Sequence, residues 1–484
     1  MRTASSAPKP QRAIHCAAVD LGATSGRVIV GTWADGHLEL VEVYRFPNGF
    51  QSLGAHDYWD LPGLWAEVRT GLREAAARFP RIASVGVDTW GVDHVLVDEI
   101  GRLIFPAHAY RDARTQAGLQ RLANTRAALE RIYAATGIPN VFYNSSLQLA
   151  ETVASCPAVT DLASRCLLLP DYFNFLLSGR MENELTIAST TQLLDVHSTD
   201  WSRATLDYFH LPPRWFTTPV LPGRKLGRVT GIPELKDAEV IVVPGHDTAA
   251  AYDAMPADPG GSDLYLSSGT WSLVGFESDR PVLGPDALAA RVANERTASG
   301  GYRPLTNVIG FWLLEGVLKA FPNRPQSEQD RNRLTAAAAA RPAPRQLLDT
   351  TDPAFANPPS MRAAIDAQLR AAGARPPRDL PGYVRLICAS LGQGQADAKA
   401  GFERMTGRKF RRILVVGGGS RNPLLCQATA DAAGIPVVSY SLEGTAVGNL
   451  ARQLIALGAV RDLATFRASL ARDLKSSVYA PRAA

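Results

Sequence analysis

The feature that most constrains this chain is a short turn between two strand-like runs near its start. Residues 16–19 are small and apolar, as a buried strand would be, and residues 28–33 resume a strand pattern. The turn formers at 20–27 stand between them, which predicts a β-hairpin. Its glycines, hydroxyls and backbone N–H groups could cradle a polyphosphate, and an ordinary glycine-rich hairpin stays open as the alternative.

Two known nucleotide motifs do not describe this turn. It does not match G-x-x-x-x-G-K-[ST], so it is not a Walker A loop. A strand and not a helix follows it, which separates it from the dinucleotide fingerprint. The acid at the end of the first strand, Asp20, is placed to meet a cation through water, because Mg²⁺ usually keeps several waters and uses few carboxylates.

Length and composition narrow the class of protein. A chain of 484 residues suggests two domains, and 46% hydrophobic with 20% charged residues is the balance of a globular protein. A net charge of +5 is small for this length, so neither nucleic acid nor a membrane is the expected partner. Five scattered cysteines without C-x-x-C spacing fit reduced thiols, and we expect a cytoplasmic location.

The first half alternates strand and helix patterns. We expect strands at 37–45 and 94–97, a strand followed by a polar interruption over 82–93, and a surface helix at 61–79 with apolar residues at helical spacing. Helical patterns at 119–136, 145–153 and 171–177 predict an α-rich cap. This mixture favours an α/β domain over an all-β one.

The boundary between two domains is expected near residue 257. A buried strand at 241–244 runs into Gly245-His246-Asp247-Thr248, and a Pro- and Gly-rich stretch follows at 256–262. We therefore expect a flexible tail at 1–12, a first domain at 13–257 and a second at 258–484. Strands at 263–266 and 271–276 then flank a Ser/Gly/Thr turn, as strands flank the turn of the first hairpin.

Further along, a second glycine-rich turn follows a buried strand. Residues 413–416 are strand-like, 417–422 are Gly-Gly-Gly-Ser-Arg-Asn, and a helix is expected at 424–433. A turn without side chains leaves room for a nucleotide. Helices are also expected at 311–321 and 386–405, whereas 332–345, with its alanine run, predicts only a surface stretch.

Several polar groups could do chemistry at these turns. Phosphoryl transfer needs positioned phosphates, a divalent cation and a carboxylate that takes the proton from the acceptor hydroxyl. Asp247 is the candidate base, with the alternative that it is a helix N-cap before an alanine run. Asp88 and Asp93 flank Trp90-Gly91 and could simply be solvated or capping. The stretch 111–114 could form an internal ion pair or hold a sugar hydroxyl.

Taken together, the motifs resemble the FGGY family of carbohydrate kinases over residues 17–457. The most specific segments are VDLGATSGR at 19–27, VDTWGVD at 87–93, YRDART at 110–115, PDYF at 170–173, HDT at 246–248 and LSSGTWS at 266–272. The resemblance implies an α/β fold of two ribonuclease-H-like (actin/hexokinase-type ATPase) domains that flank a deep cleft. The implied substrates are ATP, with Mg²⁺, and a small ketose.

The resemblance also assigns roles to residues. The implied ATP contacts are Ala23, Thr24, Ser25, Gly26, Arg27, Thr270, Glu315 and Gly418, with Asp20 near Mg²⁺. The implied sugar-site residues are Gly91, His246, Asp247, Thr248 and Asn307, with Asp247 as the proton acceptor. The implied reaction is phosphorylation of L-rhamnulose at O1; L-fuculose or L-xylulose are alternative acceptors, and an actin-like nucleotide sensor is the alternative outside the enzymes.

Two positions depart from the family pattern. Glu315 stands where the related sequences have Gln near the nucleotide, and an anion beside phosphates is unfavourable unless it is protonated, turned away or bridged by a cation. The paired cysteines of the second domain are missing, since that region has only Cys426, with Thr429 and Ala433 in place of the pair. Disulfide chemistry is therefore not expected.

Overall fold

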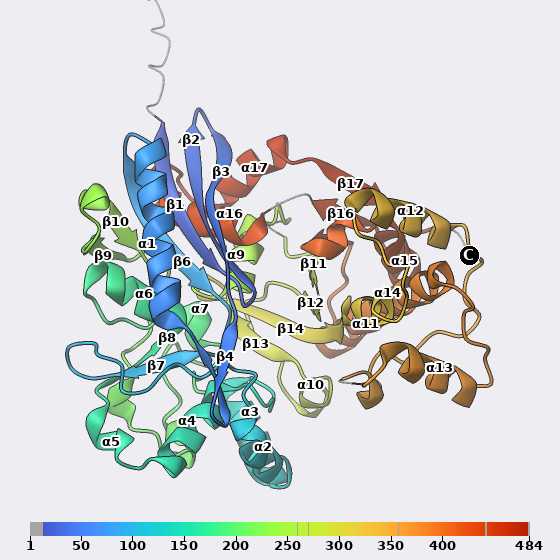
Figure 1. Ribbon diagram of the computed structural model, residues 1–484, viewed down its shortest axis with the longest axis horizontal. Coiled ribbons are helices and arrows are strands. Elements are labelled where there is room, and N and C mark those ends of the chain that lie inside the picture. The colour runs from blue at the N-terminus through green and yellow to red at the C-terminus, as the bar shows by residue number, and fades with distance from the viewer. Residues whose placement is uncertain (1–12, 259, 270, 357, 441–442, 483–484) are drawn as a thin grey trace, which may run out of the picture. The chain divides into compact units, whose positions relative to one another are not determined.

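The computed structural model describes residues 13–258, 260–269, 271–356, 358–440 and 443–482, so the predicted ATP contact Thr270 lies outside the described residues. The chain forms two compact units (Figure 1). The first comprises Met1–Pro256, Glu295–Gly301 and Gly444–Asp473, and the second comprises Ala257–Asn294, Tyr302–Glu443 and Leu474–Ala484. The expected boundary at 257/258 is next to the division between the units at Pro256/Ala257. Two stretches of the expected second domain, Glu295–Gly301 and Gly444–Asp473, belong instead to the first unit.

The first unit is built on a six-stranded sheet in the order β3-β2-β1-β6-β10-β9. Its strands are β1 (Ile14–Leu21), β2 (Ser25–Ala34), β3 (His37–Pro47), β6 (Ile82–Thr89), β9 (Lys225–Arg228) and β10 (Glu239–Ile241). β1 pairs antiparallel with β2 and parallel with β6, which confirms the predicted opening hairpin and the α/β character. Two small hairpin sheets pair β4 (Phe50–Leu53) with β5 (His56–Trp59), and β7 (His94–Val97) with β8 (Arg165–Leu168).

Helices cover both faces of this sheet (Figure 1). On one face, Val85 and Val87 pack with the apolar stripe of α1 (Leu61–Arg78) and with α6 (Leu169–Ser178). On the other, Gly31 and Gly86 lie under α16 (Gly444–Ala456), where an added Cβ would come within 2.6 Å of Leu450 and 2.8 Å of Asn449 respectively. The sheet therefore needs a helix from late in the chain to bury its second face, which is why Gly444–Asp473 belongs to the first unit.

Helices between residues 116 and 208 form the expected α-rich part. They are α2 (Gln116–Ala123), α3 (Arg126–Thr136), α4 (Ser145–Ser155), α5 (Val159–Leu162), α7 (Leu185–Ala188) and α8 (Arg203–Tyr208). Two further helices, α9 (Asp247–Ala254) and α17 (Leu463–Asp473), pack instead with α16. The single helix predicted at 119–136 is wrong, because Thr125 has non-helical backbone angles (φ −110°, ψ 72°) and starts a second helix.

The second unit contains a seven-stranded sheet in the order β13-β14-β12-β11-β15-β16-β17. Its strands are β11 (Asp263–Ser268), β12 (Trp271–Gly275), β13 (Ala293–Arg296), β14 (Tyr302–Ile309), β15 (Arg412–Val416), β16 (Val437–Tyr440) and β17 (Ser476–Tyr479). The last two residues of β13, Glu295 and Arg296, belong to the first unit. Its antiparallel β11–β12 pair repeats the opening hairpin of the first unit, and β15 runs parallel to β11 as β6 does to β1. The predicted likeness between the two halves is therefore present in the pairing of the strands.

The described part of this unit has six helices: α10 (Pro285–Ala289), α11 (Trp312–Leu318), α12 (Glu328–Ala339), α13 (Met361–Ala371), α14 (Leu380–Thr406) and α15 (Pro423–Ala433). The stretch 332–345 is mostly exposed, as expected, and the sequence analysis did not identify the helix in it: α12 runs through its alanines to Ala339. A capping box starts that helix: the Ser327 hydroxyl accepts from the backbone N–H of Asp330, whose carboxylate accepts from the N–H of Ser327. Within the described ranges, no helix has the length and apolar character needed to cross a membrane.

Candidate active site

The opening hairpin is closed by its own backbone. The N–H of Gly22 donates to the carbonyl of Ser25 at 2.9 Å, and the Asn48 amide donates to the carbonyl of Gly22 at 2.7 Å. Thr24 is exposed at the tip, whereas Gly26 is buried. An added Cβ at Gly26 would come within 2.3 Å of the Phe46 ring, so this glycine makes room for Phe46. Among the predicted phosphate contacts, Ala23, Thr24 and Ser25 therefore have the accessible positions.

Asp20 and Arg27 form an ion pair across the hairpin. They are cross-strand partners, and the guanidinium approaches Oδ2 to 2.7 Å with both side chains largely buried, 9% and 17% exposed. Asp88 stands beside Asp20 in the parallel register of β1 and β6. Burial raises the pKa of Asp88 well above its usual value, and the neighbouring charge of Asp20 raises it further. Two carboxyl groups therefore lie side by side here: that of Asp20, which is paired with a cation, and that of Asp88, whose raised pKa favours its protonated form.

The predicted base lies at the start of a helix. α9 begins at Asp247, and its N-cap is His246, which makes no side-chain capping bond. The Asp247 carboxylate is 34% exposed, and its Oδ1 accepts from the Thr248 hydroxyl at 2.9 Å and lies 3.4 Å from Nε2 of His246. Asp247 is therefore the first residue of the helix and not its cap, so the capping alternative is wrong.

A buried glutamate fixes the turn that precedes α9. Oε2 of Glu184 accepts from the N–H of Gly245 at 2.9 Å, and the same oxygen accepts from the Thr186 hydroxyl at 2.7 Å. The Thr186 hydroxyl in turn accepts from the N–H of His246 at 3.4 Å. Sequence reasoning missed Glu184, since it lies 61 residues from this turn and has no motif of its own.

Two more residues, Glu295 and Gly91, lie beside the His246 ring. Oε2 of Glu295 lies 3.1 Å from Nδ1 of His246. Gly91 faces the other ring nitrogen: a Cβ added there would lie 3.3 Å from Nε2. The structure therefore brings together Gly91, His246, Asp247 and Thr248, as the sequence predicted, and adds Glu295, which the sequence did not single out.

Hydrogen bonds to the Asp93 carboxylate hold the loop that carries Gly91. Oδ2 of Asp93 accepts from the indoles of Trp59 at 2.6 Å and Trp90 at 2.8 Å, and Oδ1 accepts from Gln148 at 3.2 Å. Burial raises the pKa of Asp93 to about 6 despite these donors. Asp88 and Asp93 are both fully buried, so the interpretation of them as solvated strand ends is wrong.

Val92, next to Gly91, has a left-handed backbone with φ 69°, which is strained for a β-branched residue. Two hydroxyls hold it there: Thr190 accepts from its N–H at 3.1 Å, and Ser145 donates to its carbonyl at 2.5 Å. The backbone at Gly91 is thus fixed on both sides. Strain held in this way is typical of sites whose geometry matters for function.

The second predicted polar cluster, at 111–114, forms the internal ion pair. The Arg114 guanidinium lies 3.1 Å from Glu151 and 4.0 Å from Asp112, and its side chain is only 3% exposed. Asp112 also accepts from the N–H of Asp57 at 2.8 Å. This cluster therefore joins three segments of the first unit.

In the second unit, the glycine-rich turn after β15 is open. Gly418 is exposed, and an added Cβ there would meet no atom of the described residues within 4 Å. Its neighbours lie close to Ser268 on β11, because a Cβ at Gly419 would come within 2.0 Å of the Ser268 hydroxyl. A short 3₁₀ turn, Gly418–Arg421, precedes α15, whose N-cap Asn422 accepts from Leu424 and Leu425. An uncovered backbone beside a helix N-terminus suits a nucleotide.

The other two predicted ligand residues of the second unit are exposed. Asn307 lies on β14 opposite Leu273 of β12, and Glu315 lies in the first turn of α11. Exposure leaves the Glu315 carboxylate solvated. The roles assigned to both residues stay predictions.

The acidic groups of the first unit suit a hydrated cation better than a direct protein cage. Within the described ranges, no group of three or more His, Cys, Asp or Glu side chains has the arrangement to hold a metal ion. Asp20 is already bound by Arg27, and Oδ1 of Asp88 is buried with no hydrogen-bond partner among the described residues. One charged carboxylate at the edge of a hairpin predicted to hold phosphates fits Mg²⁺ that keeps most of its water.

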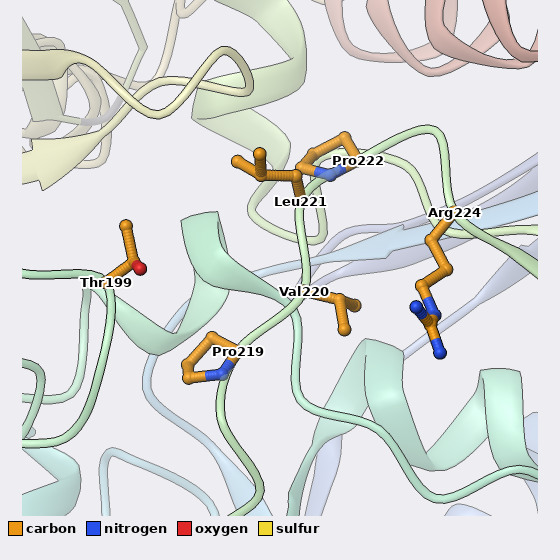
Figure 2. Close-up of a pocket in the computed structure, with 6 residues that line it drawn as sticks. All are labelled: Thr199, Pro219, Val220, Leu221, Pro222 and Arg224. Atoms are coloured by element: carbon orange, nitrogen blue, oxygen red, sulfur yellow. The ribbon is translucent and has the colours of Figure 1, made fainter.

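An open hollow of about 470 Å³ lies elsewhere in the first unit (Figure 2). Thr199, Arg224 and the segment from Pro219 to Pro222 line it. It contains none of the predicted site residues. Most of this lining is apolar, including two prolines and a half-exposed Leu221. Its one guanidinium, that of Arg224, lies 3.5 Å from the Glu182 carboxylate, so the hollow offers little to hold a phosphate or a sugar.

Comparison with known proteins identifies the family. Residues 15–252 match the N-terminal domain of the FGGY family of carbohydrate kinases, and residues 264–457 match its C-terminal domain. A rhamnulokinase of Klebsiella pneumoniae (strain 342) is 40% identical over 470 residues, 96% of this chain and 94% of the relative. A rhamnulokinase of Pectobacterium carotovorum subsp. carotovorum (strain PC1) is 40% identical over 471 residues, 96% and 93% of the two chains.

Solved structures share the fold at much lower identity. A xylulose kinase from Lactobacillus acidophilus superposes with a TM-score of 0.77 at 16% identity, over 97% of this chain and 94% of that one. A glycerol kinase from Plasmodium falciparum, solved with ADP, gives 0.77 at 13% identity with the same coverage. The predicted actin/hexokinase-type fold is confirmed. With both family domains matched along most of its length, this chain belongs to the FGGY family of carbohydrate kinases.

Proposed function

We propose that this chain is an ATP-dependent kinase that phosphorylates L-rhamnulose at O1 to give L-rhamnulose 1-phosphate, as a step in L-rhamnose catabolism. The rhamnulokinases that match nearly its whole length support this substrate. The observation that carries the proposal is the Asp247 carboxylate, one-third exposed at the start of α9 with His246 and Thr248 beside it. Such a group can take a proton from an alcohol.

The chemistry follows from the contacts of that carboxylate. Thr248 and His246 both lie against Oδ1, which leaves Oδ2 to take the hydroxyl proton of O1. As this proton moves to Asp247, O1 bonds to the γ-phosphorus of ATP and the bond from that phosphorus to the bridging oxygen of ADP breaks. The Asp247 side chain points from the first turn of a helix that Glu184 holds in place, so the acceptor oxygen has a fixed position.

The nucleotide contacts are proposed from exposure and backbone geometry. In the first unit, residues 23–25 offer backbone N–H groups and hydroxyls to the phosphates, with Arg27 holding Asp20. In the second unit, Gly418 offers an uncovered backbone to the nucleotide. Mg²⁺ bound with ATP would neutralise phosphate charge during transfer, and Asp20 would meet it through water.

A ketose panel tests this function. Purified protein is supplied with Mg·ATP and, in turn, L-rhamnulose, L-fuculose, L-xylulose and glycerol, and ADP release is followed by a coupled assay. We expect kcat/KM for L-rhamnulose to exceed that for each other acceptor by at least about tenfold, because one hydroxyl contact separates epimers. Phosphorus NMR of the product should place the phosphate on O1. Preference for another ketose, or ATP use that no sugar stimulates, would overturn the proposal.

A further inference from the structure

The His246 imidazole lies between two carboxylates. Its Nδ1 is 3.1 Å from Oε2 of Glu295, and its Nε2 is 3.4 Å from Oδ1 of Asp247. The two acids differ in their surroundings: Glu295 is 12% exposed, and Asp247 is 34% exposed. One nitrogen of the ring therefore faces the interior, while the other faces the proposed base.

Glu295 is held in this position by its neighbour in the chain. The N–H of Arg296 donates to the Ser189 hydroxyl at 2.9 Å, and its guanidinium donates to the carbonyls of Val196 and Gly300, each at 3.1 Å. Arg296 is 4% exposed. These bonds fix the segment Glu295–Gly301 within the first unit, and so fix the carboxylate that faces His246.

The other ring nitrogen, Nε2, lies next to Gly91. Gly91 approaches Nε2 so closely that an added Cβ would lie 3.3 Å away, and the backbone at Gly91 is held in turn by Val92 and Asp93. A small residue at that point leaves space beside Nε2. A hydroxyl group of the sugar fits this space, next to the oxygen that takes the proton.

We propose that Glu295 is a positioning residue, which keeps the proton of His246 on Nδ1 and leaves Nε2 as a hydrogen-bond acceptor for a hydroxyl of the sugar. This inference rests on the sugar kinase function proposed above. A carboxylate at Nδ1 selects the tautomer that donates to it, and the ring orientation follows. The sugar is thus recognised by an acceptor, Nε2, beside the base Asp247.

The opposite tautomer would weaken the base. With the proton on Nε2, the ring would donate to Oδ1 of Asp247, which already accepts from the Thr248 hydroxyl. Each hydrogen bond to a carboxylate favours its charged form and lowers its affinity for a proton. Glu295 therefore contributes to proton transfer without touching the substrate.

The tautomer can be observed without any turnover. In protein labelled with ¹⁵N-histidine, a long-range ¹H–¹⁵N correlation spectrum distinguishes Nδ1–H from Nε2–H, and the His246→Gln variant identifies the signals of His246. We expect Nδ1–H in the unsubstituted protein and a shift toward Nε2–H in Glu295→Ala. Glu295→Gln keeps an acceptor oxygen, so it should retain Nδ1–H and serve as the conservative variant if the alanine variant does not fold.

Kinetics give a second, separate readout. We expect Glu295→Ala to lower kcat/KM for L-rhamnulose by about 10- to 100-fold, the loss typical when the hydrogen-bond partner that orients a metal-ligating histidine is removed, and to leave the KM for ATP unchanged. Glu234→Ala, which removes a carboxylate 48% exposed at the surface, is the matched control and should change neither value.

The outcomes separate the two proposals. Nε2–H in the unsubstituted protein, or an unchanged tautomer and unchanged sugar kinetics in Glu295→Ala, would overturn the role of Glu295. Absence of rhamnulose turnover in the unsubstituted protein would overturn the proposed function, while the spectrum would still report whether Glu295 selects the tautomer.

Discussion

The guanidinium of Arg27 donates to a single oxygen of Asp20 twice, from Nε at 2.9 Å and from Nη2 at 2.7 Å. The two residues are cross-strand partners where the opening hairpin turns. This pair orients an acid at the edge of the proposed phosphate loop. The positive charge of Arg27 also opposes the rise in the pKa of the neighbouring Asp88.

Arg27→Met should therefore harm both stability and nucleotide use. It leaves Asp20 largely buried without its cation, and breaking such a pair typically costs about 3–5 kcal/mol. We expect a lower Tm and a KM for ATP raised about tenfold, measured by calorimetry and by the coupled assay. Arg45→Met removes the exposed pair with Glu42 on β3 and should cost less than about 1 kcal/mol. Equal effects of the two substitutions would contradict the role given to Arg27.

Asp247→Asn tests the proposed base directly. The amide keeps the size of the side chain but cannot take the proton from O1, and positioned general bases contribute about 10²–10⁴-fold. We expect kcat to fall at least about a hundredfold, with Tm and nucleotide affinity unchanged. Asp237→Asn, at a carboxylate 62% exposed, serves as the control. Near-normal turnover of the Asp247 variant would remove this residue from the role.

Asp93 should make stability depend on pH. Its pKa is raised by burial to about 6, whereas an Asp in the unfolded chain titrates near 3.8. Between these values the folded protein keeps a proton that the unfolded chain has lost, so Asp93 destabilises the fold progressively as pH rises from about 4 to 6. The two-unit difference amounts to roughly 3 kcal/mol.

The measurement compares urea unfolding of the unsubstituted protein and Asp93→Asn from pH 4 to 8. The stability of the unsubstituted protein relative to the variant should fall as pH rises to about 6 and then stay level. Parallel curves over the whole range would show that Asp93 does not titrate in this window. At pH 7, the variant should also turn over the sugar more slowly, since its amide N–H₂ would face the indoles that hold the loop at Gly91.

Gly91→Ala tests how close the sugar site comes to His246. The added methyl would lie 3.3 Å from Nε2 of His246 and 3.4 Å from Cγ2 of Thr190, in the space proposed for a sugar hydroxyl. We expect KM for L-rhamnulose to rise about tenfold, the loss of roughly one hydrogen bond, and KM for ATP to stay the same. Gly118→Ala on α2, where the nearest atom would be 3.5 Å away, should change neither.

The elements that local patterns determine were predictable from sequence, and those that depend on distant partners were not. The opening hairpin followed from a turn between two apolar runs, and α9 from a strand that leads into alanines. Glu295 could not be found in this way, because it lies 49 positions from His246 in the chain and the fold alone brings the two together. Asp93 could not be recognised as buried, since one of its partners is Trp59, 34 residues earlier.

One missed element did have a local signal. The start of α12 is marked by Ser327 and Asp330, a capping pair three residues apart, which the alanine run then extends as a helix. By contrast, nothing in the sequence of α16 shows that this helix covers strands β1, β2 and β6. Two glycines on these strands, Gly31 on β2 and Gly86 on β6, are the local hint that a helix approaches closely.

The contact between α16 and α9 gives the last prediction, because it places the helix that carries Asp247. A Cβ added at Gly448 would lie 1.7 Å from the carbonyl oxygen of Ala250, a clash with backbone that no rotamer relieves. Gly448→Ala should thus push α9 away and lower both Tm and kcat. Gly401→Ala, inside α14 with its nearest atom 3.9 Å away, should instead stabilise the protein by about 0.5–1 kcal/mol, as alanine for glycine does in an open helix. If the Gly448 variant kept full stability and activity, the close packing of these two helices could not be what positions Asp247.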